Sequence, residues 1–99
     1  MVFFDLPVKT KAERKHATQF RNFLLSDGYY MVQYSVYVRI CNGTDSVAVH
    51  KTRLEAAVPP KGAVRAIVVT EKQYNNIDIL VGKPQRQDKP QNYEQLVIF

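Results

Sequence analysis

Near its start the chain has a short apolar run that is followed directly by an acid and, two residues later, by a proline. Val2-Phe3-Phe4 is followed by Asp5, and the chain then turns at Leu6-Pro7. Because proline cannot donate to a sheet ladder, the run predicts a short buried strand that ends at the acid. A carboxylate at such a strand end is either a metal or catalytic ligand, or a structural acid that caps a helix or pairs with a base. Asp5 is the first candidate site residue, and alone it supports both interpretations.

The next segment predicts an amphipathic helix with one basic side. Thr10, with Glu13 three residues later, forms a capping box, and Gly28 marks the end of a helix that runs to about Asp27. One arc of this helix is apolar, and the opposite arc carries the cations Lys11, Arg14, Lys15 and Arg21. The net charge of the chain is +5, and the segment from Lys9 to Arg21 carries five cations against the single acid Glu13, a net +4. That concentration favours a polyanionic partner such as nucleic acid, and a solvated helix face is the alternative.

The rest of the chain alternates between strand and helix patterns. Tyr29–Cys41 alternates apolar with polar side chains, which predicts a half-exposed strand that contains Ser35. A second helix is expected from about 45 to 58, where Pro59-Pro60 ends it. The most apolar segment, Ala63–Val69, predicts a central strand. Shorter elements follow: a capped helical turn at Thr70–Gln73, a strand at Ile77–Val81 and a final strand at Leu96–Phe99.

This order of elements predicts an α+β fold, a ferredoxin-like β-α-β-β-α-β sandwich with an additional C-terminal strand. We expect the second and third strands to be joined through the region of the second helix rather than by a tight hairpin. A bend of the Tyr29–Cys41 strand near Gln33 is the alternative that the ferredoxin-like plan leaves open. Residues 1–82 are expected to form the domain, and residues 83–99 a polar linker and the last strand. The linker can span up to about 40 Å, which reaches a neighbouring subunit. A homodimer with exchanged C-terminal strands is the resulting hypothesis.

Composition and missing motifs narrow the class of protein. No run is long and apolar enough to span a membrane and no secretory signal is visible, which predicts a cytoplasmic protein without a membrane partner. The single Cys41 excludes an intrachain disulfide and a zinc cluster, and is expected to be a packed thiol. P-loop and GxGxxG patterns are absent. His16 and His50 lie on apolar helical stripes, so both are expected to be partly buried packing residues.

Four segments in order carry a resemblance to a known family: Val2–Pro7, Gln33–Arg39, Pro59–Arg65 and Val69–Tyr74. Together they resemble the small CRISPR-associated adaptation proteins usually called Cas-two. The resemblance covers nearly the whole chain. It looks closest to the branch found beside the single-protein effector Cas-nine, in the type II systems.

The resemblance implies a ferredoxin-like homodimer that serves CRISPR antiviral defence. The family is described as a magnesium-dependent endonuclease on RNA or DNA. It also bridges dimers of the integrase Cas-one and holds the double-stranded DNA that is inserted as a new spacer. Asp5 matches the family's strand-end aspartate, the proposed metal ligand and catalytic residue. Ser35 and Tyr37 match its Ser-Val-aromatic segment near the dimer axis.

A Mg²⁺ ion suits this layout only in a dimer, because two copies of Asp5 across a two-fold axis supply two oxygen ligands where one chain supplies one. The expected nucleic-acid contacts are Lys11, Arg14, Lys15, Arg21 and, as secondary candidates that could instead be structural ion-pair partners, Arg39 and Arg65. Three functions stay open. They are a metal-dependent nuclease acting through Asp5, a non-catalytic DNA-holding adaptor for the integrase, and a small toxin-type ribonuclease of similar size and plan.

Overall fold

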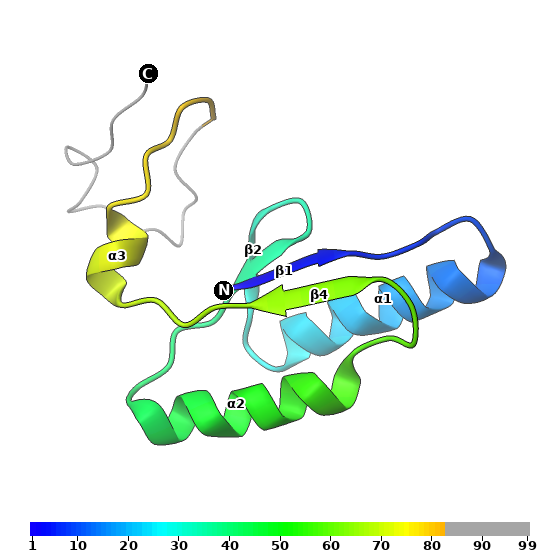
Figure 1. The fold of residues 1–99 in the computed structure, drawn as a ribbon, viewed down its shortest axis with the longest axis horizontal. Coiled ribbons are helices and arrows are strands. Elements are labelled where there is room, and N and C mark those ends of the chain that lie inside the picture. The colour runs from blue at the N-terminus through cyan, green and yellow to red at the C-terminus, as the bar shows by residue number, and fades with distance from the viewer. Residues whose placement is uncertain (83–99) are drawn as a thin grey trace. The chain divides into compact units, whose positions relative to one another are not determined.

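Four short strands pair into one antiparallel sheet in the order β2-β3-β1-β4 (Figure 1). The structure is a computed structural model, and it describes residues 1–82. The strands are β1 (Val2–Asp5), β2 (Tyr30–Gln33), β3 (Val36–Val38) and β4 (Ala63–Ala66). All four belong to the first of two compact units, Met1–Val68, in which β1 pairs with both β3 and β4.

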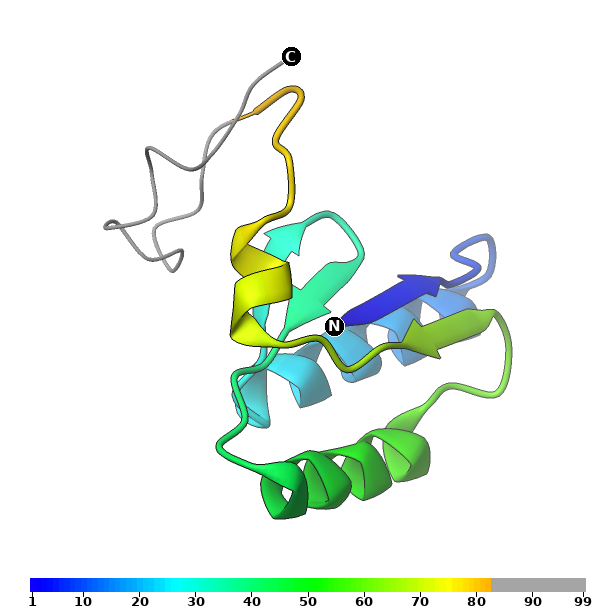
Figure 2. The ribbon, with the colours of Figure 1, turned by 60° about the vertical axis from the view of Figure 1, so that its left-hand side comes forward.

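Two helices cover one side of this sheet (Figures 1 and 2). Helix α1 (Lys11–Ser26) lies between β1 and β2 in the chain, and α2 (Thr44–Ala57) lies between β3 and β4. The predicted capping box starts α1: the hydroxyl of Thr10 accepts from the Glu13 amide at 3.1 Å, and the Glu13 carboxylate accepts from the Thr10 amide at 3.0 Å. After α1, Gly28 adopts a φ of +92° and turns the chain toward β2.

The core lies between the sheet and the two helices. The rings of Phe4 and Phe20 meet edge to face with centroids 5.2 Å apart, and Tyr37 stacks on Phe4 at 5.6 Å. The buried cluster joins β1, β3, α1 and α2, and consists of Val2, Phe4, Phe20, Leu24, Tyr29, Tyr37 and Leu54. Because alternate residues of a strand point to opposite faces, Phe3 and Asp5 project from the face of the sheet away from the helices.

These elements confirm the predicted ferredoxin-like α+β fold, with the order β-α-β-β-α-β and a fully antiparallel sheet. The second unit begins at Val69 and contains α3 (Glu71–Asn75), which starts at the predicted Thr70–Gln73 capping box. The expected linker and final strand fall on residues 83–99, outside the described residues. Among residues 1–82, no helix combines the length and the apolar character needed to cross a membrane.

The prediction of a single strand at Tyr29–Cys41 is wrong, because this segment folds into a tight hairpin. Strands β2 and β3 pair around a turn at Tyr34 and Ser35, and β2 carries a bulge. Ser35 adopts a φ of +63°, so the chain reverses here without a glycine. The second and third strands are therefore joined by this hairpin and not through the second helix. The turn and the bulge also shift which side chains point toward the core and which point to solvent. As a result Tyr37 enters the core and Tyr34 is exposed.

Three smaller expectations also need correction. Ile77–Val81 forms no strand. A strand is stable only when it pairs with others, and this segment pairs with no strand within residues 1–82. Strand β4 ends at Ala66, short of the predicted Val69. His16 is exposed, because it lies at the edge of the apolar arc of α1, whereas His50 is buried.

Candidate functional site

Asp5 occupies the end of the central strand, as the sequence predicted. It is the last residue of β1 and pairs with Ala63 of β4. Its side chain is exposed on the face of the sheet away from α1 and α2, the same face that carries Phe3. The carboxylate therefore stands on a sheet surface beside an apolar residue, and a second molecule can reach it there.

Gly62 packs closely against the backbone of Asp5. It has a φ of +102°, which residues with side chains rarely adopt. A Cβ atom at this position would lie 2.7 Å from the carbonyl oxygen of Asp5 and 2.9 Å from the side chain of Leu6. Only glycine fits this close approach. The loop before β4 therefore fixes the end of β1 and, with it, the position of Asp5.

The part of one chain that the structure describes gathers no cluster of metal ligands around Asp5. Within the described residues, no group of three or more His, Cys, Asp or Glu side chains comes together. Asp5 supplies a single carboxylate, whereas Mg²⁺ takes six oxygens and commonly keeps several waters alongside one or two carboxylates. Two copies of Asp5 facing each other would match that donor set. The residues present therefore fit a magnesium ion better at an interface between two chains, where two carboxylates meet, than on one chain, which offers one.

The structure places Ser35 and Tyr37 differently with respect to Asp5. The amide of Phe4 donates to the carbonyl of Ser35 at 3.1 Å, so the hairpin turn lies beside the end of β1. Tyr37 is only 4 % exposed, and its ring stacks on Phe4 in the core. Ser35 is thus near Asp5 through the backbone, whereas the Tyr37 ring points to the helix-covered face.

The four predicted cations of α1 lie on one side of the helix, which we call the basic face of α1: Lys11, Arg14, Lys15 and Arg21. From Lys11 to Arg21 the helix rises about 15 Å. Arg14 also donates to two carbonyls of the preceding loop. Among residues 1–82 both ion pairs involve Asp27, so no carboxylate there forms an ion pair with these cations. The basic face of α1 therefore keeps its positive charge.

A partly buried charged cluster, which no local sequence pattern indicates, joins the end of α1 to α2. Atom Oδ2 of Asp27 lies 2.8 Å from Nδ1 of His50, and Oδ1 lies 3.0 Å from Nη1 of Arg53. The Asp27 side chain is only 8 % exposed. Desolvation acts to raise the pKa of Asp27, but the hydrogen bonds from His50 and Arg53 outweigh it and hold this pKa below its usual value. Because the carboxylate can only accept, Nδ1 of His50 carries the proton.

Arg39 binds the backbone close to the Asp27 cluster. Its Nε donates to the carbonyl of Asp27 at 2.7 Å, and its Nη1 donates to the carbonyl of Ile40 at 2.7 Å. These bonds occupy donors that a phosphate contact would need, which favours the structural alternative for Arg39. Arg65 is exposed and lies opposite Phe3 in the register of β1 and β4, so it shares the sheet face of Asp5.

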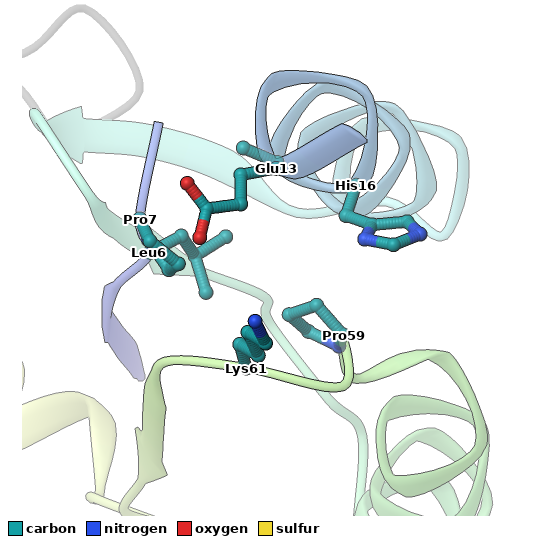
Figure 3. Close-up of a pocket in the computed structure, with 7 residues that line it drawn as sticks. Leu6, Pro7, Glu13, His16, Pro59 and Lys61 are labelled. Carbon is teal, nitrogen blue, oxygen red and sulfur yellow. The ribbon is translucent and has the colours of Figure 1, made fainter. Parts of the chain in front are cut away.

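A small pocket lies beside the loop that follows β1 (Figure 3). Its lining is Leu6, Pro7, Glu13, His16, Ala17, Pro59 and Lys61. Its volume of about 20 Å³ holds about one water, so it does not admit a nucleotide. The Thr10 amide, helped by the Lys9 amide and the Lys61 ammonium, outweighs the effect of burial and lowers the pKa of Glu13. This carboxylate therefore serves the helix cap.

The sequence matches a known protein family and is similar to several named proteins. Residues 1–77 match the family model described as "CRISPR associated protein Cas2". The chain is 52 % identical over 99 residues to a protein named CRISPR-associated endoribonuclease Cas2 from Acidovorax ebreus, covering 100 % of this chain and 97 % of that one. It is 47 % identical over 83 residues to a protein of the same name from Ligilactobacillus salivarius, covering 84 % and 82 %. A third, from Campylobacter jejuni, is 40 % identical over 99 residues, covering 100 % and 69 %.

Proposed function

The chain belongs to the CRISPR-associated Cas2 family, and from this premise we propose that it acts in CRISPR adaptation as a homodimer that holds double-stranded DNA. In this role it bridges the Cas-one integrase while a new spacer is inserted. The observation that carries the proposal is the basic face of α1, whose four cations lie along about 15 Å of helix without an ion-paired carboxylate among residues 1–82.

The spacing of these cations suits a phosphate backbone. A duplex carries one negative charge per about 1.7 Å of its axis, so a row of cations along a helix meets several phosphates at once. Contacts of this kind position a protein on DNA and carry no sequence information. This suits a protein that holds fragments of any sequence for insertion.

The homodimer is proposed from the sheet face that α1 and α2 leave uncovered. Phe3 is 38 % exposed on this face, and the register sets Val36 and Arg65 on either side of it. A second copy packed here would bury Phe3 and bring the two Asp5 carboxylates toward each other. Addition of Leu96–Phe99 to the partner's sheet edge would extend the interface.

The similar proteins are named endoribonucleases. We therefore propose that this chain has a magnesium-dependent endonuclease activity on RNA or DNA. A bound Mg²⁺ ion would polarise the phosphodiester and lower the pKa of an attacking water. The chain contributes the Asp5 carboxylate, which the contact with Gly62 holds at the end of β1. Glu13 is engaged in the helix cap and His50 in the Asp27 cluster, so neither is available to move a proton. A scaffold without catalysis and a toxin-type ribonuclease are the competing outcomes.

The Asp5→Asn variant separates these outcomes, because it keeps the shape of the side chain and removes one negative charge per chain. Nuclease activity and integrase-dependent spacer insertion are measured on one preparation shown by circular dichroism to be folded. We expect metal-dependent cleavage to be lost and spacer insertion to persist. Loss of both activities would contradict the DNA-holding role, and cleavage that survives the substitution would remove Asp5 from the site.

We also propose that the chain belongs to the type II branch, on the strength of the four sequence segments quoted above. The neighbouring genes test this directly. A Cas-nine effector, a Cas-one integrase and a repeat array beside this gene are the expected result. A neighbourhood without an integrase or a repeat array would count against both the branch and the pathway.

A further inference from the structure

The β2–β3 hairpin presents a large aromatic side chain to solvent at its turn. Tyr34 is 75 % exposed, although a phenol ring of this size is normally at least half covered. It neighbours Ser35, whose φ of +63° sets the shape of the turn. The hydrogen bond from the Phe4 amide to the Ser35 carbonyl ties this turn to the central strand. Tyr34 therefore stands on an anchored part of the backbone.

Arg21 holds the Tyr34 ring from the neighbouring helix. Its Nη2 donates to the hydroxyl of Tyr34 at 3.2 Å, and its Cζ lies 5.6 Å from the centre of the ring. One side chain of the basic face of α1 thus contacts the ring by both a hydrogen bond and a cation–π contact. The guanidinium has five N–H donors, and the bond to Tyr34 uses one of them. The rest of the ring stays open to solvent.

We propose that Tyr34 and Arg21 form a binding site for an unpaired nucleobase, with Tyr34 stacking on the base and Arg21 meeting the adjacent phosphate. This inference rests on the proposed nucleic-acid function and extends it from paired to unpaired nucleotides. A base inside a duplex hides both faces in the stack, whereas every base of a single strand can turn a face toward an exposed ring, so the single strand is the ligand that this ring fits. Stacking of a base on an aromatic side chain contributes about 1–3 kcal/mol and tolerates any base.

The Arg21–Tyr34 pair could instead only fasten the hairpin to α1. The two roles differ in what they require of the ligand. A stacking site discriminates between a strand with bases and a strand of the same charge without them. A contact that only fastens the hairpin, or one that is purely electrostatic, would bind both strands equally well.

Binding of labelled single strands of about 12 nucleotides measures this discrimination, since this length lies within the usual site size of single-strand binders. The probes are oligo(dT) and oligo(U), each beside an abasic strand of equal length and charge. For the unmodified protein we expect the strand with bases to bind at least about fivefold more tightly than its abasic counterpart, on DNA, RNA or both. Tyr34→Ala should reduce this ratio to near one, whereas Tyr34→Phe, which keeps the ring, should retain it.

Ile40→Ala serves as the matched control, since Ile40 is another large, exposed side chain just after β3. Its ratio should equal that of the unmodified protein. A ratio near one for the unmodified protein on both DNA and RNA would overturn the proposal, as would a ratio that survives Tyr34→Ala. Failure of the proposed function looks different: duplex binding would then show no dependence on salt, whatever the ratio between single strands.

Discussion

The contact between Gly62 and the Asp5 carbonyl determines how the candidate metal ligand is presented. Asp5 lies at an exposed strand end, where a carboxylate would otherwise move with the loop that follows it. A Cβ at Gly62 would lie 2.7 Å from the Asp5 carbonyl oxygen and 2.9 Å from the Leu6 side chain, so the Gly62 backbone packs closely against this strand end and restrains it. The position of Asp5 could be predicted from sequence, because an apolar run closed by an acid is a local pattern. The role of Gly62 could not, because the fold brings together residues that are distant in the chain.

Gly62→Ala should lower the free energy of unfolding by about 1–3 kcal/mol and displace the end of β1, because the new Cβ meets the backbone of Asp5. Urea denaturation measures the change. Gly43→Ala is the control, since Gly43 also has a positive φ, +87°, but a Cβ there meets nothing within 4 Å. Equal losses in the two variants would show that backbone strain alone is responsible and would contradict the contact with Asp5.

Among the elements, α1 and α2 are joined by the cluster of Asp27, His50 and Arg53 as well as by apolar packing. The sequence predicted both helices closely, because caps, stripes and the terminating prolines are local signals. It missed this cluster because His50 lies 23 residues, and Arg53 26 residues, from Asp27. It missed the β2–β3 hairpin for a related reason. Ser35 adopts the left-handed conformation without the glycine or asparagine that usually signals it.

The Asp27 cluster should make the protein sensitive to acid. The folded-state pKa of Asp27 lies below its unfolded value, so its stabilisation is present above a pH of about 3.9 and is lost as the pH falls through the folded pKa. Asp27→Asn should lower the free energy of unfolding at neutral pH by about 1–3 kcal/mol and weaken its dependence on pH below 4. Thermal melts across this range measure both effects.

Asp78→Asn makes the same change of charge outside the first unit and is the control for this experiment. It should leave the acid limb of the stability curve as it is in the unmodified protein. If Asp27→Asn loses stability in acid as steeply as the unmodified protein does, the cluster does not supply the pH dependence.

For the whole molecule, the proposal depends on two copies of the chain, because one chain supplies a single Asp5 carboxylate and two copies supply a second oxygen donor to a magnesium ion. In this proposal the sheet face of Phe3, which α1 and α2 leave uncovered, would supply one surface for the dimer, and Leu96–Phe99 would supply another. Deleting residues 95–99 should therefore weaken dimerisation, as measured by light scattering over a dilution series. A monomer for the intact chain, or an equally strong dimer for the truncated one, would show that this account of the assembly is incorrect.

The salt dependence of duplex DNA binding tests the central claim most directly. If a dimer neutralises about six phosphates, log K should fall with log[salt] at a slope of about −5, and Lys11/Lys15→Ala, which removes four cations per dimer, should reduce it to about −2. Lys51/Lys72→Ala removes the same charge from α2 and α3 and should keep the slope near −5. A slope near zero for the unmodified protein, or equal slopes for the two double variants, would contradict a DNA-holding role for the basic face of α1.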